Sequence, residues 1–252
     1  METKLTLFRG LLITLFLTIS ASASASEPFT FANNPIPMSW SGFYVAGDFG
    51  SGWGLAKWTY QNDNFFNTTA TLRAGNDFHF DLSGVAGGGD FGFNYQSQRL
   101  IVGMETSVWG ADFTPSMASP FFPATDTYTA LTHLFLSVKG RLGVAFDRFL
   151  GYLNIGWAGG RSSLRLTNAI VNNVYAGSTY WGNGWLLGSG IDYRLLRPLS
   201  LGIVYNFVQV SFKDKAIYCA LCSTGPGNGT PIVKNRTNAN FVTLRLTYLF
   251  SQ

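Results

Sequence analysis

The sequence of 252 residues has little charge and only two cysteines. Charged residues make up 12% of it, about half of their usual share in globular proteins. Two cysteines are too few for the disulfide framework of a small secreted domain. The net charge of +4 is spread along the chain without a run of lysine or arginine, so nucleic acid is excluded as a partner.

Histidine is also scarce, since the chain contains only His79 and His133. Nucleophilic catalysis requires a base within hydrogen-bond reach of the nucleophile, and neither histidine belongs to a compact His-x-Ser pair. Two histidines without a clear carboxylate or thiol beside them make a poor metal site. The sequence therefore predicts no catalytic residues, no metal and no cofactor.

The main apolar run lies near the N-terminus and is short. Lys4 and Arg9 precede the apolar segment Leu11–Ile19, and a stretch of alternating serine and alanine follows. This order indicates a secretory signal peptide, with cleavage after Ala23 or Ala25. The alternative, a membrane anchor helix, needs about 20 apolar residues. The predicted division is a signal peptide over 1–25, a periplasmic lead-in over 26–39 and a β-barrel over 40–250.

Glycine and aromatic residues are abundant, and they follow a period of two. In Leu134–Phe146 one set of alternate residues is almost wholly aliphatic, whereas the other contains Lys139 and Arg141. Successive side chains of a strand point to opposite faces, so this pattern predicts a strand with one apolar face. Its length suits a tilted strand that crosses a bilayer, which needs about 9–11 residues.

The same alternation predicts eight strands in all, joined by connections that are alternately long and short. The predicted strands are Trp40–Trp53, Phe80–Tyr95, Arg99–Phe113, Leu134–Phe146, Phe149–Leu164, Thr179–Leu195, Leu199–Phe212 and Asn238–Phe250. This organisation is typical of an antiparallel, up-and-down transmembrane β-barrel.

A soluble secreted β-domain with the apolar face inside remains the alternative, because alternation alone does not tell which face is lipid-exposed. Aromatic residues near the strand ends favour the membrane interpretation, since they form interfacial girdles in such barrels. These residues are Trp40, Phe80, Tyr95, Trp109, Phe149, Trp181, Phe212 and Tyr248.

Two segments carry a family resemblance. The segment Trp40–Gly54 resembles the first strand of the Omp25/Omp31-like porin-family barrels of alphaproteobacteria. The segment Val242–Phe250 is similar to their aromatic-terminated last strand, although Ser251 and Gln252 follow here. The resemblance implies an OmpA-like barrel in the bacterial outer membrane, assembled by the barrel assembly machinery and surrounded by outer-membrane lipid and lipopolysaccharide. Some relatives bind haemin, so it also implies haem or a host factor as a ligand of the loops.

Charged residues of the predicted strands take the parity opposite to the large apolar residues. An eight-stranded barrel encloses just enough space for side chains, and charges there need partners. The sequence therefore predicts an interior plug of ion pairs, with Arg141 against Glu105 as the best pair. The alternative is a conducting channel, in which inward glycines leave gaps for water. The predicted network consists of Asp48, Asp90, Glu105, Lys139, Arg141, Asp192 and Arg245.

The long connections provide two further candidate sites. Cys219 and Cys222 form a CxxC motif that predicts a small loop-closing disulfide in an exported protein. Loops carry recognition on rigid scaffolds, and exposed apolar patches mark partners. Aromatic residues predicted for such a role, or for a hydrophobic clasp between loops, are Trp58, Tyr60, Phe65, Phe66, Phe121 and Phe122.

We therefore expect an outer-membrane barrel with a structural, envelope-related role and with loops for adhesion or recognition. A narrow passive porin for small solutes is the alternative from another class of function. Binding of haem or a host factor through the loops is a third.

Overall fold

The chain folds as an all-β barrel in a computed structural model. The structure describes residues 38–61, 75, 77–118, 124, 126–168, 173–216, 218–219 and 232–250. Within these residues no helix is long and apolar enough to cross a membrane.

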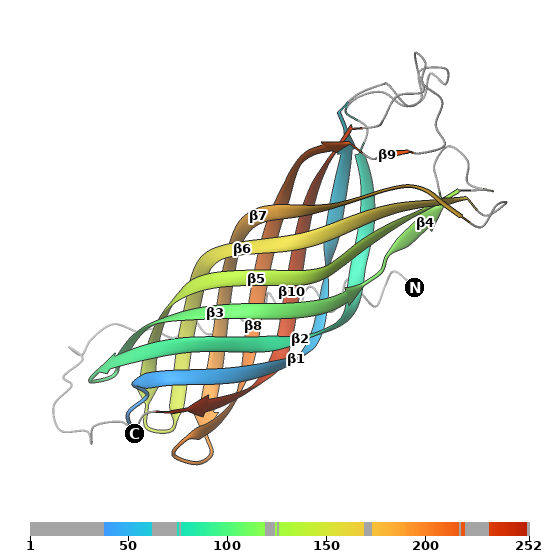
Figure 1. Ribbon diagram of the computed structural model, residues 1–252. Helices are drawn as coiled ribbons and strands as arrows, with labels where there is room; N and C mark the ends of the chain where they lie inside the picture. Colours follow the sequence, from blue (N-terminus) through green and yellow to red (C-terminus); the bar gives the residue numbers. More distant parts are fainter. Residues whose placement is uncertain are drawn as a thin grey trace, which may run out of the picture. The chain divides into compact units, whose positions relative to one another are not determined.

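Eight long strands form the barrel, and each is antiparallel to both of its neighbours (Figure 1). The strands are β1 (Gly42–Tyr60), β2 (Asp77–Ser97), β3 (Leu100–Phe113), β5 (Asp126–Phe146), β6 (Phe149–Asn168), β7 (Asn173–Arg194), β8 (Leu199–Ala216) and β10 (Ile232–Leu249). The pairing of β1 with β10 and of β3 with β5 closes the sheet. Two short strands, β4 (Ser116–Ala118) and β9 (Tyr218–Cys219), pair with β5 and β7 at the end with the long loops. The predicted fold class is confirmed.

The strands are strongly staggered. Following paired residues once around the barrel from Val45 returns to Leu55, ten positions further along β1. The path runs through Val45, Phe91, Thr106, Val138, Trp157, Trp185, Gln209, Asn238 and Leu55. Stagger and strand number together set the tilt and width of a barrel, and eight strands leave room only for side chains.

Over most of its height the barrel has an apolar outer face and a polar interior. The side chains of Phe49, Met104 and Ile155 are 64–68% exposed, whereas Glu105 and Arg245 are at most 1% exposed. On β1 the outward apolar residues extend from Phe43 to Leu55. At ~3.3 Å per residue and a tilt near 45° this belt is roughly 28 Å high, which matches the hydrocarbon thickness of a bilayer. The alternation predicted from the sequence is confirmed.

Several strands continue further toward the long loops than predicted. β1 ends at Tyr60 rather than at Trp53, and β5 begins at Asp126 rather than at Leu134. Beyond the belt the alternation persists with reversed polarity: Trp58 and Tyr60 point inward, whereas Lys57 is partly exposed on the outer face. The predicted ends were wrong because the end of the apolar belt was interpreted as the end of the strand.

The strand-end aromatics divide into two groups. Tyr95, Phe149, Trp181 and Tyr248 face outward at the two margins of the belt, as an interfacial girdle requires. The other four residues have inward parity or lie at the barrel mouth, so their assignment to a girdle was wrong. These buried residues are Trp40, Phe80, Trp109 and Phe212.

Candidate functional site

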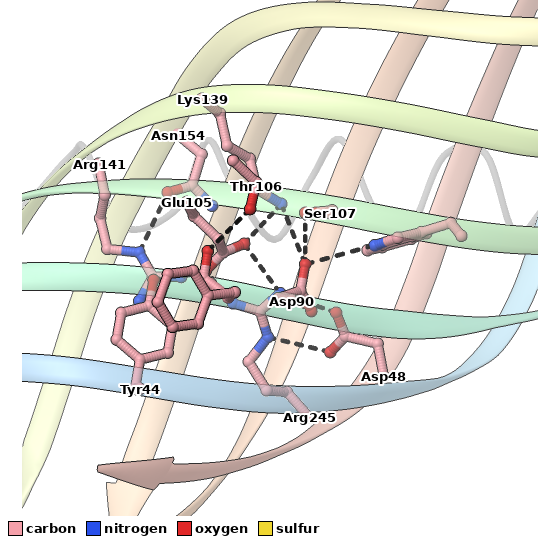
Figure 2. A network of polar contacts seen from close by, with 12 residues as sticks. Tyr44, Asp48, Asp90, Glu105, Thr106, Ser107, Lys139, Arg141, Asn154 and Arg245 are labelled. Carbon is pink, nitrogen blue, oxygen red and sulfur yellow. Dashed lines mark hydrogen bonds and ion pairs between the residues drawn. The ribbon is translucent and has the colours of Figure 1, made fainter. Parts of the chain in front are cut away.

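The inward charges converge in one layer of the barrel interior, which we call the ionic layer. Its members come from five strands whose inward positions meet at one height, because stagger and alternation place them there. Figure 2 shows these side chains pointing toward one another across the lumen. The ionic layer consists of Asp48, Asp90, Glu105, Lys139, Arg141 and Arg245.

Glu105 is the centre of the ionic layer. Its carboxylate lies 2.7 Å from Nζ of Lys139, 2.8 Å from Nη1 of Arg245 and in direct contact with Nη2 of Arg141. The Tyr44 hydroxyl donates a fourth hydrogen bond to Oε2, at 2.7 Å. Three cations and one hydroxyl therefore surround a single buried carboxylate, and the predicted contact between Arg141 and Glu105 is among them.

Arg245 joins the three carboxylates of the ionic layer. Its Nε and Nη2 donate to the two oxygens of Asp48, at 2.9 and 2.7 Å. Nη2 also lies 3.0 Å from Oδ2 of Asp90, and Nη1 reaches Glu105. The layer contains three carboxylates and three cations, so its formal charges balance. Such balance is what buried charges require, because each unpaired ion carries a large desolvation penalty.

Neutral side chains complete the hydrogen bonding of the layer. Ser107 and the Trp109 indole donate to Oδ1 of Asp90, the indole at 3.4 Å. Nε of Arg141 donates to Asn154 at 3.3 Å, and its guanidinium lies 4.0 Å from the Tyr152 ring centre. Alternation identifies these residues as inward, but no sequence signal shows which polar atoms they contact.

Asp192 lies outside the ion-paired group. Tyr152 donates to its Oδ1 at 3.3 Å, and within the described part of the chain it forms no ion pair within 4 Å. The sequence placed Asp192 in the same network as the other six charges. The structure instead connects it to that network through the Tyr152 hydroxyl, which lies 3.5 Å from Nη1 of Arg245.

Inward glycines provide space for these long side chains. A Cβ atom at Gly92 would collide with the Tyr44 ring, and one at Gly190 would collide with the Tyr152 ring. One at Gly156 would collide with the carbonyl oxygen of Val138 and with the Cα and Cβ atoms of Lys139 on the neighbouring strand. At Gly92 and Gly190 the glycine surface is covered by a neighbouring side chain, so the gaps expected for a channel are filled there.

Above the ionic layer, toward the long loops, the lumen contains a second layer that is apolar. Phe241 is its centre, with ring centres 5.4 Å from Trp109, 5.8 Å from Phe113 and 5.6 Å from Phe135. We call this group the aromatic layer, consisting of Trp58, Tyr60, Phe80, Trp109, Phe113, Tyr128, Phe135, Tyr180, Phe212 and Phe241. All are buried against one another or against small aliphatic residues.

The aromatic layer corrects one predicted site. Trp58 and Tyr60 were predicted as exposed loop aromatics, but they lie on β1 inside the barrel and are 3% and 6% exposed. Trp58 packs on Phe80, with ring centres 4.9 Å apart. The prediction was wrong because the hydrophobic side chains in this part of β1 face the lumen. The other four predicted recognition residues, Phe65, Phe66, Phe121 and Phe122, lie outside the described residues.

A third group closes the end with the short turns. Trp40, just before β1, is buried there with Leu150 and Ile101. Its ring lies 3.9 Å from the Arg194 guanidinium, which also donates to the carbonyl oxygen of Ser39 at 2.7 Å. The sequence analysis did not identify this contact.

The remaining candidate residues do not assemble into a site. His79 lies on β2 and His133 on β5, with β3 between these strands, and both are exposed. This arrangement does not bring the two histidines together as a haem site would require. Cys222 lies outside the described residues, so the disulfide between Cys219 and Cys222 remains a prediction.

No protein-family profile matches the chain, and no curated protein matches its sequence. Among solved structures, it is similar to a Neisserial surface protein A, with 12% identity, a TM-score of 0.41 and coverage of 83% of this chain and 98% of the other. The outer-membrane protease OmpT of Escherichia coli gives 10% identity, a TM-score of 0.47 and coverage of 83% and 97%. The outer-membrane protein OprG of Pseudomonas aeruginosa gives 11% identity, a TM-score of 0.44 and coverage of 83% of this chain and 97% of the other.

Proposed function

We propose that the chain is an integral protein of a bacterial outer membrane, and that its sealed barrel supports the envelope while holding long loops outside for adhesion or recognition. The outward apolar belt supports this location, because a soluble protein rarely exposes so large a continuous apolar surface. Closure of the sheet supports it too, since it pairs the backbone groups that an open edge would leave bare in lipid.

One observation carries the assignment to a structural rather than a transport role. The lumen is filled twice in succession, by an ionic layer whose six charged side chains are at most 5% exposed and by the aromatic layer above it. An ion that crossed would have to break buried ion pairs and also pass through close-packed rings. The arrangement supports a plugged barrel over a narrow porin.

Conductance in a planar bilayer tests this proposal. We expect the refolded native protein to show no single-channel events. Glu105→Ala and Phe241→Ala each leave one layer intact, so neither variant should show single-channel events. The double variant should conduct ions. Steady conductance of the native protein would contradict the plug and would establish a small porin.

A further inference from the structure

The outer face of the barrel carries a group of cations above the apolar belt, on the adjacent strands β8, β10 and β1. Lys57 of β1 is paired in register with Arg236 of β10, and Lys234 lies two residues further toward the loops. The pairing of β8 with β10 shifts register between Val233 and Asn235 of β10, and Lys213 of β8 lies opposite this shift. We call these four cations the basic patch. All of them face away from the lumen, on the parity opposite to the buried residues of their strands.

The basic patch keeps an excess of positive charge. Lys57 forms an ion pair with Asp77 at 2.7 Å, and Thr59 donates to the same carboxylate at 2.6 Å. These hydrogen bonds, first from Lys57 and then from Thr59, lower the pKa of Asp77. Asp214 is exposed beside Lys213. The four cations thus outnumber the two carboxylates near them, Asp77 and Asp214. Within the described residues Arg236, Lys213 and Lys234 have no ion pair.

The neighbouring side of the rim has the opposite character. Besides Asp77, which is paired with Lys57, Asp81 and Asp112 are exposed on β2 and β3 near the long loops, and the described residues at these two strand ends include no lysine or arginine. The charge of this part of the rim is therefore unevenly distributed. Cations are in excess on β8, β10 and β1, and carboxylates are in excess on β2 and β3. An anionic ligand would be attracted to the first group of strands and repelled by the second.

Directly below the basic patch lies a band of ordered amides and aromatic rings. Gln209 accepts from the Trp185 indole and donates to Asn238, both at 3.0 Å. Asn240 accepts from the Tyr205 hydroxyl at 2.8 Å. Below this band the belt continues with apolar residues such as Leu244. From the belt upward, the face therefore presents apolar, hydrogen-bonding and cationic groups, which is the order of acyl chains, polar linking groups and phosphate in a membrane lipid.

We propose that the basic patch binds the phosphate of a lipid headgroup in the outer leaflet, with the amide band against the polar groups that link this phosphate to the acyl chains. The site rests on the proposed membrane location and adds a specific lipid contact to it. Lys234 and Arg236 are the central contacts, since they lie on β10, between β8 and β1, and neither forms an ion pair with Asp77. Each lysine or arginine near an anionic lipid surface changes affinity about fivefold.

Native mass spectrometry of the refolded protein in zwitterionic detergent tests the site, with bisphosphorylated lipid A as the probe. The test variant is Lys234→Gln with Arg236→Gln. The matched control is Arg161→Gln with Arg165→Gln, which removes two exposed cations from the same end of β6. We expect the test variant to lose about 25-fold in affinity and the control to stay within about twofold.

Further probes separate the alternatives. Dephosphorylated lipid A should bind no better to the native protein than to the test variant, and millimolar inorganic phosphate should not compete with lipid A. Equal losses in test variant and control would overturn the site in favour of a uniformly basic rim. Competition by inorganic phosphate would overturn the lipid as its ligand. A heat-dependent gel shift of each variant reports barrel folding, so failure of the barrel is distinguished from failure of the site.

Discussion

The ionic layer and the aromatic layer occupy the same lumen on the same strands, and they have opposite chemistry. At the height of the ionic layer the outer face is apolar and the interior charged, as with Phe49 outside and Asp48 inside. At the height of the upper part of the aromatic layer, beyond the apolar belt, the outer face is polar and the interior apolar, as with Lys57 outside and Trp58 inside. The same alternate residues point inward through both layers, so only the polarity of the inward and outward side chains changes and not their direction.

This inversion follows from the surroundings of the barrel. Where lipid surrounds it, outward residues must be apolar, and the interior can be charged if every charge is paired. Where water surrounds it, only the interior can bury apolar surface, and the upper part of the aromatic layer, with Trp58 and Tyr60, does so there. The lower part of the barrel therefore has the polarity of a membrane barrel, and the upper part has the polarity of a soluble β-barrel.

The largest effect is expected from breaking the ionic layer at Arg245. Arg245→Ala leaves Asp48 without the cation that contacts it, and it should cost about 5 kcal/mol in free energy of unfolding. Urea unfolding in lipid vesicles, followed by gel mobility, measures the loss. Arg245→Met should lose nearly as much, because charge rather than volume is missing. Stability equal to that of the exposed-site variant Arg148→Ala would contradict this account.

Phe241→Ala should cost about 3–4 kcal/mol, because it leaves a cavity among three aromatic rings. Here the conservative variant behaves differently from Arg245→Met: Phe241→Leu keeps most of the volume and should recover much of the loss. The same unfolding assay compares the two layers. If Phe241→Leu were as unstable as Phe241→Ala, packing would not explain the stability of the aromatic layer.

A smaller effect is expected at the glycines beneath the ionic layer. Gly92→Ala forces the Tyr44 ring away from its place and should cost about 1–3 kcal/mol. Gly47→Ala is the matched control, because it points outward on β1 with no atom within 4 Å of the added Cβ. Equal stability of the two variants in the urea assay would show that Tyr44 does not need the space over Gly92.

The smallest effect concerns the upper rim, where water screens charge. Lys57→Gln should raise the pKa of Asp77 toward its ordinary value while leaving overall stability unchanged. Carboxyl NMR titration measures the shift. Because the pKa of Asp77 is lowered in the folded protein, any stabilisation from it is present above the ordinary pKa and is lost as the pH falls through the lowered value. An unchanged pKa in Lys57→Gln would exclude Lys57 as the cause.

Much of the fold could be predicted from the sequence, because lipid imposes a period-two pattern that identifies each strand and its inward face. The charges on that face could be named for the same reason. Their contacts could not: stagger decides that Arg245 on the last strand meets Asp48 on the first, and stagger depends on pairing around the whole barrel.

The aromatic layer was missed for a different reason. Trp58 and Tyr60 follow the end of the apolar belt, and hydrophobic residues among polar ones resemble a loop when strands are identified by an apolar outer face. The signal that was present is the unchanged parity from Tyr44 to Tyr60. Continuing the strand while allowing its polarity to invert would have placed both residues inside.

The level at which lipid gives way to water tests the central claim most directly. Spin labels at Gly47→Cys in the belt and Thr59→Cys above it, in a background with both native cysteines replaced by serine, report contact with oxygen in lipid or with a water-soluble nickel reagent. We predict that in reconstituted bilayers the label at Gly47 collides mainly with oxygen and the label at Thr59 mainly with nickel. Nickel access at both positions would contradict the account, because the apolar belt would then not lie in lipid.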